Sequence, residues 1–262
     1  WIAGEQRLIF SDIPGDAMHS WDERHGVTTF RSPSRKANGS TLDRSGRLVT
    51  CEHATSRVVR LEHDGRLAVL AAEFRGARLN SPNDVVVAAD DAVWFTDPDF
   101  GTTLPDMGVV RPRETDIAGV YRLDADTGTL DLVVADLGQP NGLCINDATR
   151  DLYVNDTATG LVHRYRLAGA GPQTIATDHR VWAEIPGDET GSVDGLKLDV
   201  AGNLYCTGPG GVLVFDPRGR QIALIAVPET VGNFAWGGVD GRTFFACAST
   251  SVYRLRVEIP GF

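Results

Sequence analysis

Five asparagine or aspartate residues recur at one place in a repeated pattern, and each of them leads into a short apolar strand. They are Asn38, Asn83, Asn141, Asp194 and Asn233. A second apolar strand opens about ten residues after each of them, at Leu48, Val93, Leu152, Leu204 and Phe244. Amide and carboxylate oxygens without imidazole or thiolate suit a hard cation such as Ca²⁺, Mg²⁺ or Mn²⁺. If the fold brings these side chains together, they form a metal site.

The spacing of the repeat indicates how that happens. Successive copies begin about 40 to 60 residues apart, which is the spacing of four-stranded propeller blades with loops of variable length. In a closed ring of blades, equivalent residues at the mouths of the innermost strands converge on the axis. The fragment RLIFSDI adds a sixth second strand to the five copies. We therefore expect an all-β fold, a six-bladed β-propeller with an axial metal site, in a single domain over residues 1–262.

A simpler explanation exists for any one of these residues, because Asn and Asp at the start of a strand often form Asx turns. That explanation does not account for their recurrence at one position of the repeat. We assign Asn83, Asn141 and Asp194 as the metal ligands. Asn38 and Asn233 occupy equivalent repeat positions, and we expect them to lie behind the ligands or to contact substrate.

Composition excludes several other classes of function. The formal net charge of −10 and the pI near 5.0 argue against a nucleic-acid or anionic-membrane partner. No apolar run reaches the length of a transmembrane helix, and no GxSxG, HExxH or Walker motif is present. The four cysteines form no CxxC pair, so we expect reduced thiols and a cytoplasmic location.

Short strands separated by turn signals run from end to end, without sustained helical periodicity. The pattern gives blade one no innermost strand and blade six no outermost strand, and we expect residues upstream of Trp1 to supply the former. The segment 102–118 interrupts blade three between its second and third strands. It is either a tolerated surface insertion or a lid over the axial site, and the sequence leaves both open.

Four phrases give the chain a family resemblance. RLNSPNDVVV, AVWFTDPDFG, QPNGLCIND and SVDGLKLD, in this order, resemble the SMP-30/gluconolactonase family of regucalcin-like, calcium-binding lactonases. The resemblance covers essentially the whole chain. It implies a six-bladed propeller with one axial divalent metal, and it gives Asn83, Asn141 and Asp194 as three of four ligands. The fourth is a Glu of blade one, which the register places three or four residues before Trp1.

Other residues near these motifs have expected roles. The resemblance makes Asp84, which follows the Asn83 ligand, a group behind the ligands or a proton acceptor near the metal, and turn anchoring is the alternative. Asn80 and Asn83 are the candidates for binding substrate, and Asp194 and Asp84 are the candidates for handling protons. We expect structural roles for three residues at the far ends of second strands, which are Glu52, His53 and Asp97.

The expected activity is the hydrolysis of a sugar lactone, such as gluconolactone, with one divalent cation. Ca²⁺ is the preferred ion, and Zn²⁺, Mg²⁺ and Mn²⁺ are alternatives. The expected partner is a small-molecule lactone, and the oligomeric state stays open. Two other functions remain. One is a non-catalytic propeller that binds a ligand or protein and keeps the cation as a structural element. The other is phosphotriester hydrolysis at the same type of site.

Overall fold

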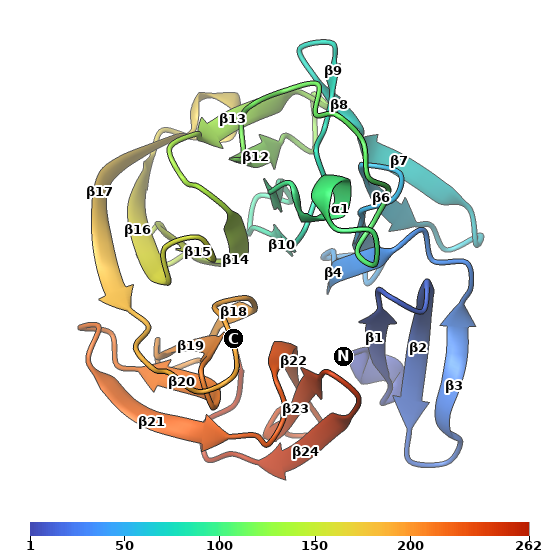
Figure 1. Cartoon of the computed structure of the whole chain (residues 1–262), viewed down its shortest axis with the longest axis vertical. Helices are drawn as coiled ribbons and strands as arrows, with labels where there is room; N and C mark the ends of the chain where they lie inside the picture. Colours follow the sequence, from blue (N-terminus) through green and yellow to red (C-terminus); the bar gives the residue numbers. More distant parts are fainter. Residues whose placement is uncertain (262) are drawn as a thin grey trace. The chain divides into compact units, whose positions relative to one another are not determined.

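A computed structural model describes residues 1–261, and nearly all of its regular structure is β-strand (Figure 1). The helical segments are three single turns, η1 (Ala3–Glu5), α1 (Phe100–Thr103) and η2 (Gly171–Gln173). Among residues 1–261, no helix is long and apolar enough to span a membrane. The expectation of an all-β chain is therefore confirmed.

The strands form six antiparallel sheets in chain order. The first holds β1 (Leu8–Asp12), β2 (Ala17–Asp22) and β3 (Gly26–Arg31). The second holds β4 (Ala37–Leu42), β5 (Leu48–Glu52), β6 (Arg57–Leu61) and β7 (Leu67–Ala71). The third holds β10 (Val85–Val87), β11 (Val93–Asp97), β12 (Gly119–Leu123) and β13 (Leu130–Val134). A two-stranded hairpin, β8 (Glu73–Phe74) and β9 (Ala77–Arg78), lies between the second and third sheets in sequence.

The second half of the chain repeats this order. The fourth sheet holds β14 (Pro140–Asn146), β15 (Asp151–Asp156), β16 (Leu161–Ala168) and β17 (Ile175–Glu184). The fifth holds β18 (Leu196–Leu198), β19 (Leu204–Gly208), β20 (Gly211–Phe215) and β21 (Gln221–Ala226). The sixth holds β22 (Val231–Gly237), β23 (Thr243–Ala248) and β24 (Val252–Arg256). In the described residues the first and sixth sheets have three strands each, as the sequence pattern predicts.

The chain divides into two compact units. Unit 1 comprises Trp1–Leu8, Asn141–Leu167 and Thr177–Phe262, and unit 2 comprises Ile9–Pro140 and Ala168–Ala176. A single domain over residues 1–262 stays a prediction.

The second strand of each sheet carries the core. All residues of β5, β11 and β19 are buried, and these strands read as nearly continuous apolar runs because both faces are covered. The outermost strand β21 is mostly exposed. In unit 2, Val49, Phe95 and Tyr121 belong to one buried cluster, and Phe95 stacks on Tyr121 with ring centroids 5.4 Å apart. Burial of side chains of this size stabilises the fold by about 1.5–3 kcal/mol each.

Unit 1 has two such clusters. One centres on Leu196, Leu204 and Leu213, and the other on Tyr205, Phe234 and Phe244. The second strands are packed on both sides, so they form a rigid support for the innermost strands that pair with them. The residues that precede β10 and β18 are therefore held by the core, although they lie outside the strands.

Candidate metal and catalytic site

The three predicted ligands all lie at the start of an innermost strand. Asn83 lies two residues before β10, Asn141 is the second residue of β14, and Asp194 lies two residues before β18. Asn83 and Asn141 are each 4% exposed, and Asp194 is half-buried. Asn141 and Asp194 belong to unit 1, and Asn83 belongs to unit 2. That all three bind one cation stays a prediction.

The glycines that follow Asn38, Asn141 and Asp194 are not turn residues. Gly39, Gly142 and Gly195 have no positive φ, so a left-handed backbone conformation does not explain why they are glycine. Each lacks a side chain because the next innermost strand runs too close. A Cβ on Gly142 would lie 2.0 Å from the Asp194 carbonyl oxygen, and one on Gly39 would lie 2.6 Å from the Asn83 carbonyl oxygen.

The same close approach corrects the alignment of the sixth sheet. Gly39 N donates to Asn83 O at 2.8 Å, and Gly195 N donates to Gly232 O at 2.9 Å. Gly232, not Asn233, therefore occupies the ligand position, and Asn233 corresponds to Asp84. Their local hydrogen bonds agree, because Val85 N donates to Asp84 Oδ1 and Phe234 N donates to Asn233 Oδ1. The equivalence expected for Asn233 is wrong by one residue, because the β22–β23 hairpin has one more cross-strand pair, Gly237 with Thr243, before Phe244 than the β10–β11 hairpin has before Val93.

A polar residue in the second strand supports each predicted ligand, and the sequence analysis missed all three. Thr96 Oγ1 accepts the Asp84 N–H at 3.1 Å, Asn155 Oδ1 accepts the Gly142 N–H at 3.1 Å, and Thr207 Oγ1 accepts the Asp194 N–H at 2.9 Å. A signal was present. The runs VWFT, LYVN and LYCT each place one polar residue after three apolar or aromatic ones, whereas the second and sixth sheets have Cys51 and Cys247 there.

In unit 2, Asn80 is fully buried behind Asn83 and Asp84. Its Nδ2 donates to Ile117 O at 2.8 Å, and its backbone N–H donates to Asp97 Oδ2 at 2.8 Å. Among residues 1–261, Asn80 Oδ1 has no hydrogen-bond partner. The amide thus holds the end of the inserted segment, and a contact of Asn80 with substrate stays a prediction.

Asp97 lies beneath Asn80 and is completely buried. Burial raises the pKa of its carboxyl to about 7, although the backbone N–H groups of Asn80 and Ser81 oppose the shift. Within the described residues Oδ1 has no hydrogen-bond partner. Its hydrogen-bond partner Asn80 donates from the backbone, and the structural role expected for Asp97 stays a prediction.

The connection 98–118 between β11 and β12, which includes the expected insertion 102–118, is anchored by His53. The His53 Nδ1 faces Met107 O at 3.0 Å, and Asn38 Nδ2 faces His53 Nε2 at 3.1 Å. A carbonyl can only accept, so Nδ1 carries the proton and Nε2 accepts from Asn38. Burial lowers the pKa of His53 to about 4, which keeps the imidazole neutral in this role.

Arg111 provides a second anchor for the segment. Its guanidinium donates to Leu79 O at 2.6 Å, to Asn80 O at 3.1 Å and to Ser56 Oγ at 2.9 Å. Arg113 adds an ion pair to Asp99 at 3.1 Å. The segment is therefore fixed in place by the hydrogen bonds of His53 and Arg111. Whether it covers the predicted metal site stays open.

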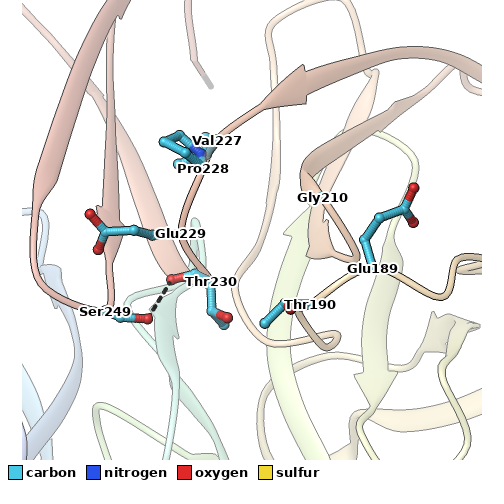
Figure 2. A pocket seen from close by; sticks show the side chains of 8 residues that line it. All are labelled: Glu189, Thr190, Gly210, Val227, Pro228, Glu229, Thr230 and Ser249. Atoms are coloured by element: carbon cyan, nitrogen blue, oxygen red, sulfur yellow. Dashed lines mark hydrogen bonds between the residues drawn. The ribbon is translucent and has the colours of Figure 1, made fainter.

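Unit 1 contains a cavity of about 430 Å³ between the connections that lead into β18 and β22 (Figure 2). Glu189 and Glu229 come from its two sides, and Ser249 donates to Thr230 O (Figure 2). Both carboxylate oxygens of Glu229 already accept hydrogen bonds, because Tyr253 and Ser251 donate to Oε1 and Thr250 donates to Oε2. These bonds, the one from Tyr253 foremost, lower the pKa of Glu229 to about 2. Its carboxylate clamps the turn before β24.

The predicted donors fit a hard cation better than a soft one. Among residues 1–261, no three His, Cys, Asp or Glu side chains are grouped as metal ligands. The predicted set is of another kind, with two amides and one carboxylate. All three are oxygen donors, and oxygen is the donor type that Ca²⁺ and Mg²⁺ prefer. The residues present therefore fit the expected ion class.

Comparison with known proteins shows the family to which the chain belongs. Residues 1–250 match the family described as "SMP-30/Gluconolactonase/LRE-like region". The chain is 32% identical to a gluconolactonase of Zymomonas mobilis, over 100% of this chain and 78% of that protein. It is 29% identical to a pentonolactonase of Haloferax volcanii, over 92% of this chain and 76% of that protein.

A solved structure shows the same fold. The gluconolactonase of Xanthomonas campestris superposes with a TM-score of 0.90 at 32% identity, covering 99% of this chain and 84% of that one. Together with the six antiparallel sheets, this likeness confirms the six-bladed β-propeller fold. The expected axial position of a metal stays a prediction.

Proposed function

Since the chain belongs to the SMP-30/gluconolactonase/LRE-like family, we propose that it is a lactonase that depends on a divalent cation and hydrolyses a sugar lactone. The observation that carries the reaction class is the match over the full chain to a gluconolactonase at 32% identity. The likeness to a pentonolactonase supports an aldonolactone substrate, because both relatives are named for sugar-acid lactones.

We assign Asn83, Asn141 and Asp194 as cation ligands. The support lies within each unit: the three residues share one place in the repeat, and a buried polar side chain accepts the backbone N–H of Asp194 or of the residue that follows Asn83 or Asn141. Ca²⁺ is the preferred ion, with Zn²⁺, Mg²⁺ and Mn²⁺ as alternatives. When bound, such a cation polarises the lactone carbonyl and stabilises the oxyanion that develops on it.

The side chains of this chain supply the proton chemistry. Water adds to the lactone carbonyl carbon, the ring C–O bond breaks, and the ring oxygen takes up a proton to give the hydroxy acid. Asp84 and Asp194 are the carboxylates that we assign to accept the proton of the water and return it. The Val85 N–H donates to Asp84 Oδ1 at 3.0 Å and fixes the direction of that carboxylate. Asn80 and Asn83 are the amides that we assign to substrate hydroxyls.

The test begins with protein freed of metal by a chelator. Ca²⁺, Zn²⁺, Mg²⁺ and Mn²⁺ are titrated by calorimetry, and each loaded form is assayed against a panel of aldonolactones and a phosphotriester. We expect one cation to bind per chain and lactone hydrolysis to return with it. Hydrolysis that is unchanged after chelation would refute the metal dependence. Faster hydrolysis of the phosphotriester would reassign the substrate class.

Replacement of Asp194 separates the enzyme from a non-catalytic propeller. Asp194→Ala removes the one anionic ligand of the assigned set, so we expect cation binding and lactone hydrolysis to be lost together. Loss of thermal stability on chelation, without lactone hydrolysis by the loaded wild type, would instead favour a cation with a structural role only.

A further inference from the structure

We propose that Thr157 and Asn155, at the end of β15, are positioning residues that orient Asn141 and Asp194 for the cation. The inference rests on the proposed function, because it concerns the ligands assigned there. It concerns unit 1 alone. Asn155 is fully buried and Thr157 is half-buried, and both follow the apolar run that forms the second strand of the fourth sheet.

Asn155 ties the two ligand backbones together. Its Oδ1 accepts the N–H of Gly142, which follows Asn141, at 3.1 Å, and its Nδ2 donates to the Asp194 carbonyl at 2.7 Å. A backbone N–H can only donate and a carbonyl can only accept, so the orientation of this amide is settled by its partners. One planar group therefore spans the two innermost strands.

Thr157 orients the side chain of Asn141 itself. Its hydroxyl has one proton, which it donates to Val193 O at 2.9 Å. Toward Asn141 the hydroxyl must therefore accept, and the atom that faces it at 3.0 Å is Asn141 Nδ2. The amide oxygen of Asn141, its assigned ligand atom, then lies on the side of the amide away from Thr157. Without the hydroxyl, nothing in this pair selects between the two flipped states of the amide.

The hydrogen bonds of Asn155 and Thr157 both join the start of β14 to the residues that precede β18. The gap is narrow, because a Cβ on Gly142 would lie 2.0 Å from Asp194 O and 2.7 Å from Leu196 N. Val193 and Asp194 each give their carbonyl to one of the two side chains. Partners that orient metal ligands typically change metal affinity by 10- to 100-fold when they are removed. An effect of that order is the expected signature of Thr157 and Asn155.

The experiment compares Thr157→Val, which keeps the shape and removes the hydroxyl, with Thr157→Ser, which restores it. Thr159→Val is the matched control, because Thr159 is exposed and lies in the same loop. Asn155→Asp is the second variant, since it keeps the acceptor for Gly142 and loses the donor to Asp194. Each protein is freed of metal, its melting temperature is recorded, and Ca²⁺ binding is measured by calorimetry.

We expect Thr157→Val to bind Ca²⁺ at least about tenfold more weakly than wild type, with an unchanged melting temperature of the metal-free protein. Thr157→Ser should return to within about threefold of wild type, and Thr159→Val should equal wild type. Asn155→Asp should also bind more weakly. Equal affinity of wild type and Thr157→Val would overturn the positioning role while the proposed metal site stands. A wild-type protein that binds none of the four cations would overturn both.

Discussion

At the scale of single residues, the glycines beside the ligands are the most constrained positions. A Cβ on Gly39 would lie 2.5 Å from Asp84 Oδ1 and 2.6 Å from Asn83 O. The second contact is with backbone, so the strand start must move. We expect Gly39→Ala to lower the free energy of unfolding by roughly 1–3 kcal/mol. It should also reduce kcat/KM for the lactone, because Asn83 and Asp84 are displaced together.

Gly4→Ala is the matched control, because a Cβ there meets no atom within 4 Å and the residue has no positive φ. Chemical denaturation and steady-state kinetics of the two variants measure both effects. Wild-type stability and activity in Gly39→Ala would show that the strands separate without cost, and the close approach would then not explain the glycine.

Asp97 gives stability a dependence on pH at the same scale. Burial raises its pKa in the folded protein to about 7, from the ordinary value of 3.8 for an aspartate. The folded state therefore holds the proton more tightly than the unfolded state. The stabilisation that protonated Asp97 gives to the folded state is complete below about pH 4 and is lost as pH rises toward 7. The slope for one proton is at most about 1.4 kcal/mol per pH unit.

Asp97→Asn mimics the protonated carboxyl. We expect the variant to lose less stability than wild type between pH 5 and pH 8, as measured by urea denaturation. Glu73→Gln, at an exposed site, should follow the wild-type profile. Parallel profiles for wild type and Asp97→Asn would mean that Asp97 is ionised throughout this range.

At the scale of elements, the hydrogen bonds of His53 stabilise the connection 98–118 between β11 and β12. The neutral imidazole joins Asn38 to Met107 O, and its pKa of about 4 lies below the ordinary histidine value of 6.5. A lowered pKa of a base means that this stabilisation is present above about pH 6.5 and is lost as pH falls toward 4.

We expect His53→Ala to raise hydrogen exchange within 98–118 at pH 7.5 and to leave exchange in β18 to β21 unchanged. The difference in melting temperature between wild type and His53→Ala should shrink as pH falls from 6.5 to 4. His63→Ala is the control, because His63 is exposed. Exchange in 98–118 that matches wild type would show that Arg111 and Asn80 hold the segment without His53.

Elements also show what the sequence could predict. The second strands were readable because both their faces are buried, so β5, β11 and β19 each open with apolar or aromatic residues. The register of the innermost strands was less readable, because one added cross-strand pair, such as Gly237 with Thr243, lengthens a hairpin without changing the apolar pattern. Asn233 was misplaced for this reason. Thr96, Asn155 and Thr207 were overlooked because a polar residue ending an apolar run also occurs at ordinary strand ends.

At the scale of the whole molecule, repetition made the fold predictable and left its chemistry less so. Six copies of one sheet, with three strands in the first and the last, follow from spacing alone. The metal site depends instead on side chains that the repeat does not treat equally, since Gly232 stands where Asn83 stands in the third sheet. The repeat therefore predicts the backbone that all six sheets share, whereas the predicted metal site depends on the positions at which the sheets carry different side chains.

The four cysteines give the last prediction, because they belong to four different sheets and are all free thiols. Cys51, Cys144 and Cys206 are buried, and Cys247 is half-buried. Burial raises the pKa of Cys51, that of Cys206 to about 12 and that of Cys247 to about 11. Thiolate is the reactive form, so all three should react slowly in the folded protein.

We expect a thiol-specific reagent to label native protein over hours and to label four thiols at once after denaturation without reductant. The melting temperature should not change with reductant, because no cross-link contributes to the fold. Any fast phase in the native protein should disappear in Cys247→Ser, since Cys247 is the thiol that is not fully buried. Fewer than four thiols after denaturation would reveal a disulfide and would contradict the four free thiols of the structure.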